Sequence, residues 1–101
     1  FQNMVLRPVI KMQHDLLIIR VKSHFSSKRV LLNVMDNKKR TDAIIKTFQS
    51  DHSLKKEIQG MITGQLSLVE FQQYLKSEHS LNKRIIQMVR NRMIDSLFEL
   101  A

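Results

Sequence analysis

The sequence predicts an all-α protein, a compact bundle of about five or six short helices. Glycine occurs only twice and proline once in 101 residues, whereas β-sandwiches and barrels place both residues in many tight turns. Apolar residues recur at three- and four-residue steps, which is the spacing of one helical face. Short polar stretches with Ser, Thr and Asp separate these segments, and such side chains cap the free N–H groups of a first helical turn. With 43% hydrophobic residues, the chain suits one globular domain.

The first predicted helix runs from residue 8 to about residue 25. Its first residue, Pro8, is tolerated in the first turn of a helix but not deeper, and the apolar residues that follow form a wide stripe. Residues 1–3 precede Met4 and resemble what remains of a tag after protease cleavage. We therefore expect a tag remnant at residues 1–3 and a single helical domain at residues 4–101.

Residues 16–35 also permit a different structure. Leu17, Ile19 and Val21 alternate with other residues, as strand residues do, and a polar stretch in the middle of this range could close a β-hairpin. The apolar residues after Ser27 also fit one helical face, with Ser27 as the cap, and short apolar runs are ambiguous by periodicity alone. We favour helices here. The alternative is an α+β fold with an N-terminal hairpin around 16–35 followed by helices.

The middle of the chain carries explicit helix boundaries. Residues 36–40 contain no apolar side chain and predict a break, after which Thr41 would cap a short helix. The next helix is expected to begin at Ser53 and to end at Gly64, where glycine suits a left-handed cap. Ser67 is followed three residues later by a glutamate, which is the spacing of a capping box. Another helix is therefore expected to start there, with its apolar residues in the core.

The second half contains a near-repeat. Residues 50–58 return as residues 77–85, 27 residues later, and both copies place a polar turn before a helix. The last helix is therefore expected to begin at Ser80 and to continue toward Leu100. Its inward stripe comprises Leu81, Ile85, Met88, Val89 and Met93.

The end of this last helix is apolar on nearly all sides. Successive residues on a helix are turned by about 100°, so the apolar residues after Met93 cannot all face one core. Soluble proteins usually bury an apolar surface of this kind in an interface, and a two-fold dimer is the commonest such interface. We therefore expect a homodimer, unless the first helix covers the same residues within one chain. The predicted interface residues are Ile94, Leu97, Phe98 and Leu100.

Positive charge is concentrated in the first half of the chain. Residues 1–50 hold ten Lys and Arg against three Asp, residues 51–101 hold seven against six Asp and Glu, and the net charge is +8. This imbalance indicates either a polyanionic partner or a solvated basic surface that only maintains solubility. Long cationic side chains also gather on one face of the last helix, from which they could reach phosphates. The predicted nucleic-acid contacts are Arg20, Lys22, Lys28, Arg29, Lys38, Lys39 and Arg40, with Lys83, Arg84 and Arg90 as secondary contacts.

Missing residue types and motifs argue against several classes of function. No cysteine is present, so there is no disulfide and no thiolate metal site. The four histidines lack a recognisable ligand spacing, and we interpret His52 and His79 as turn residues rather than metal ligands. No nucleophile motif and no glycine-rich phosphate loop is found. We therefore expect no enzymatic activity, no cofactor, no metal and no small-molecule substrate.

Two classes of function remain open. The first is a small basic regulatory protein that binds nucleic acid mainly through phosphate contacts. The second is a protein-interaction module, an adaptor or an immunity-type inhibitor, that binds an acidic protein partner through its C-terminal helix. No apolar run is long enough to span a bilayer and no secretory leader opens the chain. We therefore expect a cytoplasmic protein without a membrane partner.

Overall fold

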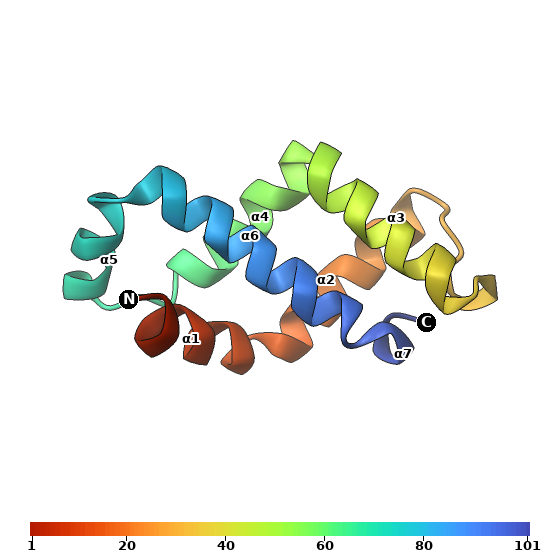
Figure 1. Cartoon of the computed structure of the whole chain (residues 1–101), viewed down its shortest axis with the longest axis horizontal. Helices are drawn as coiled ribbons and strands as arrows, with labels where there is room; N and C mark the ends of the chain where they lie inside the picture. The colour runs from red at the N-terminus through yellow and green to blue at the C-terminus, as the bar shows by residue number, and fades with distance from the viewer.

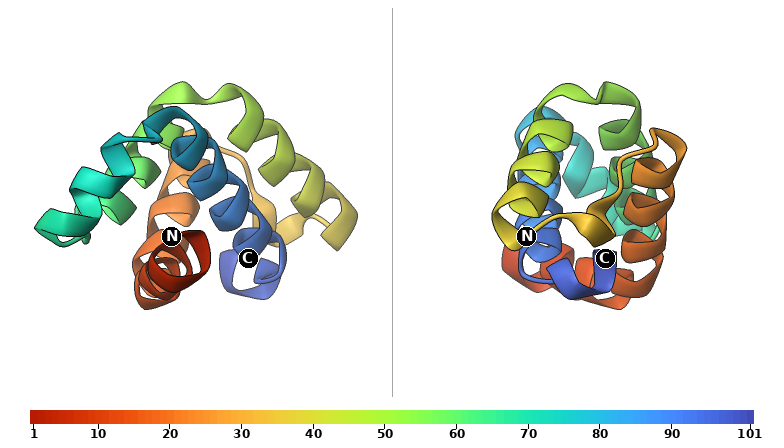
Figure 2. Two further views of the ribbon diagram at one scale, coloured as in Figure 1. Left: turned by 60° about the vertical axis from the view of Figure 1, so that its left-hand side comes forward. Right: turned by 90° about the vertical axis from the view of Figure 1, so that its right-hand side faces the viewer.

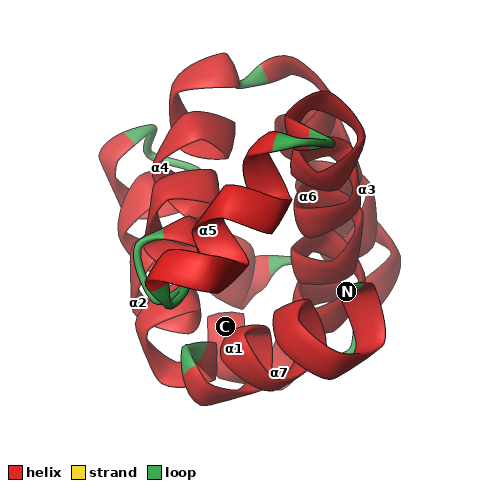
Figure 3. Ribbon diagram, turned by 90° about the vertical axis from the view of Figure 1, so that its left-hand side faces the viewer, coloured by secondary structure: helices red, strands yellow, loops and turns green.

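Helices are the only regular elements of this protein. The computed structural model describes residues 1–101, and short connections join its helices (Figure 3). In chain order the elements are the π-helix η1 (Gln2–Leu6), α1 (Arg7–Met12), α2 (His14–Ser27), the 3₁₀-helix η2 (Leu32–Val34), α3 (Asn37–Ser50), α4 (His52–Thr63), α5 (Leu68–Leu75), α6 (Glu78–Ile94) and α7 (Leu97–Leu100). Helix α6 is central, because it contacts α1, α3, α4, α5 and α7 (Figure 1). The predicted all-α bundle is confirmed.

The segment that permitted a β-hairpin is helical up to Ser27. Leu17, Ile18 and Val21 are buried, whereas Ile19 is 63% exposed. In a strand Leu17 and Ile19 would share one face, so the observed burial follows the helical period instead. The α+β alternative is therefore wrong.

Helices α1 and α2 are nearly continuous, with a bend at Gln13. The backbone hydrogen bonds persist through the bend, because Gln13 donates to Val9 at 3.0 Å and Leu17 donates to Gln13 at 2.9 Å. Pro8 lies in the first turn of α1, where its missing N–H is tolerated. The predicted first helix is therefore present in two parts, with η1 added before it.

Residues 1–3 are part of the folded structure. Phe1 packs against the core, and Nε of Arg84 donates to Oε1 of Gln2 at 3.1 Å. These contacts do not bear on where the residues come from, so the tag remnant stays a prediction.

The chain leaves α2 through a left-handed residue. Arg29 has a φ of 57°, which is uncommon for a residue other than glycine. The N–H of Arg29 donates to the carbonyl of Ser26 at 3.0 Å, and that of Val30 donates to Phe25 at 2.9 Å. This Schellman-type ending stops the helix. The helix predicted after Ser27 is therefore wrong, and only the single turn η2 forms there.

Aspartates cap the two middle helices, in place of the expected Thr41 and Ser53. Oδ1 of Asp36 and Oδ1 of Asp51 each accept a bond from the backbone N–H three residues ahead, at 2.9 and 3.0 Å. A carboxylate at this position satisfies a free N–H and also interacts favourably with the helix dipole. Both helices therefore begin earlier than predicted, and residues 36–40 form the cap and first turn of α3 rather than a break.

Gly64 ends α4 as predicted, but its backbone is right-handed. Its φ and ψ are −65° and −14°, so conformational freedom is not the reason for glycine here. A Cβ at Gly64 would lie 2.9 Å from the carbonyl oxygen of Gly60. Glycine is therefore favoured by this close approach of the backbone.

Helix α5 begins with the predicted capping box. The N–H of Ser67 donates to Oε1 of Glu70 at 2.8 Å, and the N–H of Glu70 donates to Oγ of Ser67 at 3.2 Å. The apolar residues of α5 were expected in the core, but only Tyr74 is buried and Leu68 is 77% exposed. Figure 2 shows the reason: α5 projects from one end of the molecule.

The last part of the chain turns away from the axis of α6. Helix α6 begins at Glu78, earlier than the predicted Ser80, and Asp95 and Ser96 separate its end from α7. Helix α7 then contacts α2 and α3 as well as α6, and Leu100 is buried. The predicted continuous helix toward Leu100 is therefore wrong, although all five residues of its predicted inward stripe are buried.

All seven α-helices share one core of 19 buried apolar side chains. The radius of gyration is 13.8 Å, close to the value of about 13 Å for a folded domain of this length. None of the helices has both the length and the apolar character needed to cross a membrane.

Candidate nucleic-acid interface

Two of the predicted phosphate contacts in the first half of the chain are engaged within the protein. The guanidinium of Arg20 lies 3.2 Å from the carboxylate of Glu57 and links α2 to α4. The guanidinium of Arg40 donates to the carbonyl oxygens of Leu32 and Asn33, at 2.8 and 3.3 Å, and fastens η2 to α3. Both arginines therefore have structural roles.

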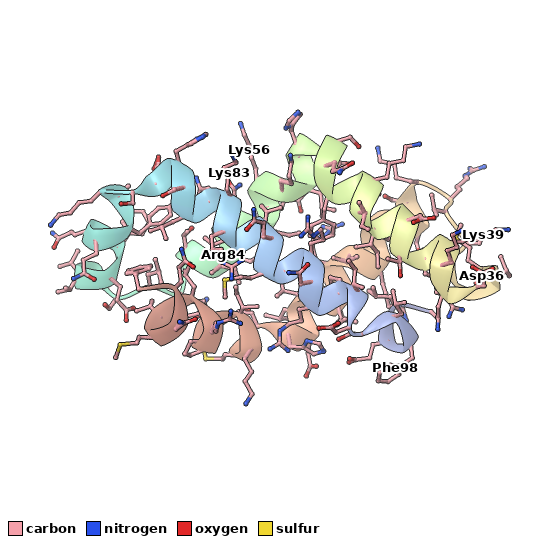
Figure 4. The ribbon with its side chains drawn as sticks, viewed as in Figure 1. Asp36, Lys39, Lys56, Lys83, Arg84 and Phe98 are labelled. Atoms are coloured by element: carbon pink, nitrogen blue, oxygen red, sulfur yellow. The ribbon has the colours of Figure 1, made fainter.

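The other predicted contacts of the first half are exposed, and none forms an ion pair. Lys28 and Arg29 follow α2, and Lys38 and Lys39 lie in the first turn of α3. Figure 4 places Lys39 at the end of the molecule opposite α5. Lys22 is exposed on α2. These five side chains remain free to contact an anion.

A groove between α4 and α6 gathers basic side chains of the second half, and we call it the lysine groove. Its volume is about 370 Å³. Lys55 and Lys56 from α4 and Lys83 from α6 line it, together with the imidazoles of His52 and His79. In Figure 4 Lys56 and Lys83 extend side by side, away from the ribbon. The remaining lining residues are Gln59, Asn82, Ile86 and Gln87.

The two copies of the near-repeat form opposite walls of the lysine groove. His52 and His79 occupy equivalent positions of the repeat, and so do Lys56 and Lys83. Each copy supplies these residues from the start of a helix, α4 or α6, and the two helices pack against each other. The repeat therefore places similar basic side chains on both sides of one groove.

The lysine groove has no acidic lining residue. None of its lysines forms an ion pair, although the ammonium of Lys55 donates to the carbonyl of Gln49 at 3.1 Å. His52 and His79 lie in the first turns of α4 and α6, where the backbone dipole is positive. Repulsion among the three lysine ammonium groups raises the free energy of the empty groove. An anion bound in the groove would reduce this repulsion.

Tyr74 orders one wall of the lysine groove. Its hydroxyl donates to Oδ1 of Asn82, which lines the groove. Burial, more than repulsion from Glu78, raises the pKa of Tyr74 above its ordinary value of 10.0. The hydroxyl therefore stays protonated, and able to donate, to a higher pH than that of an ordinary tyrosine.

A second groove, of about 680 Å³, lies between α1 and α6, and we call it the arginine groove. Arg7 and Lys11 from α1 and Arg84 and Arg92 from α6 line it. Its only acidic lining residue is Asp95. Cations therefore outnumber carboxylates in this groove as well.

Neutral side chains hold the arginines of this groove in place. Nε of Arg7 donates to the amide oxygen of Asn3 at 2.7 Å, and Nε of Arg84 donates to that of Gln2 at 3.1 Å. Nη1 of Arg92 donates to Nδ1 of His14 at 3.2 Å. None of the three pairs with a carboxylate, so their charges are oriented but not neutralised.

His14 connects Arg92 to the C-terminal turn. Because a guanidinium can only donate, Nδ1 of His14 must accept from Arg92, at 3.2 Å, and Nε2 then carries the proton. Nε2 lies 3.0 Å from a carboxylate oxygen of Glu99 in α7. His14, Asp15 and Glu99 also form a cluster of three possible metal ligands, but an ion at Nε2 would displace its proton and break the hydrogen bond to Glu99. The arrangement favours a hydrogen bond that holds α7 against α2.

Two of the three predicted contacts on α6 line different grooves. Lys83 lines the lysine groove and Arg84 the arginine groove, because consecutive helical residues are about 100° apart. Arg90 lines neither groove and donates to Oδ1 of Asn91 at 3.2 Å.

Five of the cations that line these grooves were not predicted. One pattern could have identified Lys56, since it is the repeat equivalent of Lys83. Nothing in the sequence indicates that α1 lies beside α6. The unpredicted cations are Arg7, Lys11, Lys55, Lys56 and Arg92.

Three of the four predicted interface residues contact the core of their own chain. Leu100 is buried, and Ile94 and Leu97 pack against the core. The turn between α6 and α7 brings Leu97 and Leu100 to the core. Phe98 is 80% exposed and lies at the edge of the molecule (Figure 4). The apolar surface that motivated the dimer is therefore reduced to Phe98, and the homodimer stays a prediction.

No protein-family model matches the chain, and no curated protein or solved structure matches it either.

Proposed function

We propose that this protein binds nucleic acid, mainly through contacts between the lysine groove and phosphate groups. The observation that carries the proposal is the composition of this groove, in which three lysines and two histidines line the surface without a carboxylate. The lysines would displace counterions condensed on a nucleic acid, which is the main source of sequence-independent affinity. The role is one of binding rather than catalysis, and we place it in the cytoplasm.

The exposed cations around the connection from α2 to α3 would supply further contacts. Lys28, Arg29, Lys38 and Lys39 are long, exposed side chains, and the net charge of +8 favours association with a polyanion over a distance. Contacts with phosphate position a protein without reading the bases. Affinity should therefore be similar for different sequences.

Fluorescence anisotropy with labelled duplex DNA and duplex RNA tests this function. The variant Lys56→Gln/Lys83→Gln removes two charges from the lysine groove. The matched control Lys46→Gln/Lys76→Gln removes two exposed charges outside both grooves. At low salt the groove variant should bind about tenfold more weakly than the wild type, and the control should lose much less. Equal losses would contradict the assignment of the groove, and a wild type that binds neither duplex would contradict the function.

A second candidate function is a protein-interaction module, and exposed apolar side chains favour it. Phe98 projects from α7, and α5 exposes Leu68, Val69 and Leu75. Apolar groups gathered on a surface mark contacts with other proteins. The partner would be an acidic protein, attracted by the basic surface, or a second copy of this chain.

A further inference from the structure

The arginine groove contains more positive than negative charge. Three guanidinium groups and the ammonium of Lys11 line it, against the single carboxylate of Asp95. None of these cations forms an ion pair. Cations gathered in this way repel one another, so the empty groove is electrostatically unfavourable and a bound anion would stabilise it.

The arginines are oriented with donors to spare. Arg7 uses only Nε within the protein, so both of its Nη groups are free. Arg84 uses Nε and Nη1, the latter toward Gln87 at 3.3 Å, so Nη2 is free. Arg92 uses only Nη1, toward His14. Because neutral partners fix the guanidinium groups, less conformational freedom is lost when these donors bind a ligand.

We propose that the arginine groove binds a phosphomonoester of nucleotide size, such as a nucleoside monophosphate. A phosphomonoester carries almost two negative charges and three terminal oxygens at neutral pH, which matches several converging donors. A guanidinium fork binds two such oxygens at once, whereas a lysine acts as a point charge. The volume of about 680 Å³ lies within the range of small-molecule sites.

This site is separate from the lysine groove. Lys83 and Arg84 are adjacent in the chain but line different grooves on two flanks of α6. The ligand is a free nucleotide, not a polymer, so the inference does not rest on the proposed nucleic-acid function. Its failure would leave the lysine-groove experiment unaffected.

Calorimetric titration of the full chain with AMP at low salt tests the inference. The wild type should bind one AMP with saturation, inorganic phosphate should compete, and adenosine, which lacks the phosphate, should not bind. In NMR spectra the Nε–H resonances of Arg7 and Arg84 should shift when AMP is added. Absence of saturable AMP binding, equal binding of adenosine, or unchanged arginine resonances in the presence of bound AMP would overturn the inference.

Two neighbouring variants assign the site. Arg84→Gln should weaken AMP binding by about tenfold or more, because it removes a charged hydrogen-bond donor. Lys83→Gln removes the same charge from the other flank of α6 and should weaken binding by about twofold at most. If Arg84→Gln does not fold, Lys11→Gln replaces it, since the side chain of Lys11 is exposed and forms no ion pair, and it should weaken binding several-fold. If Lys83→Gln weakened AMP binding as much as Arg84→Gln, or as Lys11→Gln where that variant replaces it, the inference would be overturned.

Discussion

His24 and Asp51 join the end of α2 to the start of α4, with Nε2 of His24 3.0 Å from Oδ2 of Asp51. The other oxygen of this carboxylate accepts the capping bond from the N–H of Leu54. That capping bond, with smaller contributions from His24 and Lys28, holds the pKa of Asp51 below its ordinary value of 3.8. One carboxylate therefore caps a helix and fastens a second helix against it.

Replacement of Asp51 by asparagine should remove a pH-dependent part of the stability. The folded state lowers the pKa of Asp51, so the ionised carboxylate stabilises the fold above about pH 3.8. This contribution is lost as the pH falls through the lower pKa of the folded state. Urea unfolding should find the wild type more stable than Asp51→Asn at about pH 6, with the difference shrinking toward about pH 2. A difference that does not change with pH would contradict this role.

Leu17 and Leu16 test the helical burial of the segment that permitted a hairpin. Leu17→Ala should lower the free energy of unfolding by about 2–5 kcal/mol, because Leu17 is fully buried. Leu16 is adjacent in the chain and largely exposed. Leu16→Ala should therefore change the free energy of unfolding by no more than about 0.5 kcal/mol. Denaturant unfolding followed by circular dichroism measures both. Similar losses from the two variants would mean that this helix buries a different face.

Arg29→Gly should stabilise the protein. The left-handed backbone of Arg29 is unfavourable for a residue with a Cβ, and its side chain is exposed. After the greater flexibility of glycine in the unfolded chain is subtracted, a gain of up to about 1 kcal/mol is expected. The control Lys28→Gly, at a φ of −89°, should instead destabilise by about 0.5–1 kcal/mol. Thermal unfolding measures the stability of both variants against the wild type. A loss of stability in Arg29→Gly would contradict the conclusion that the left-handed backbone of Arg29 is strained.

The local chemistry of the sequence predicts most of the helices, and it fails where long-range contacts decide. The capping box at Ser67 was predictable because both of its hydrogen bonds form within four residues. The sequence does not distinguish Asp36 and Asp51 from Thr41 and Ser53 as caps, because all four side chains are acceptable at that position. The exposure of Leu68 could not be predicted, because apolar spacing identifies a helical face but not whether another helix covers it.

The candidate site could be predicted only in part for the same reason. The near-repeat indicates that His52 and His79 are equivalent, but the groove exists only because α4 and α6 pack against each other. The charge excess of the first half is visible in the sequence, whereas the ion pair between Arg20 and Glu57 depends on how α2 and α4 meet. Net charge therefore indicates a class of partner, and the fold decides which cations are available to it.

Phe98→Asp tests the homodimer. If the exposed Phe98 lies in a two-fold interface, sedimentation equilibrium should find a dimer for the wild type and a monomer for the variant, because a buried aspartate without a partner is costly. Met4→Asp, at an exposed apolar residue of η1 that lies outside the surfaces of α5 and α7, serves as the control and should remain dimeric. A wild type that stays monomeric at high micromolar concentration would contradict the dimer.

The salt dependence of nucleic-acid affinity tests the central claim most directly. Anisotropy titrations with duplex DNA, repeated across a range of salt concentrations, give the slope of log K against log salt. If phosphate contacts dominate, the slope for the wild type should be steep, at about −0.9 for each phosphate contacted. It should become shallower by about 2 in Lys56→Gln/Lys83→Gln, one unit for each lysine removed. Affinity that does not depend on salt, or an unchanged slope in this variant, would contradict binding through the lysine groove.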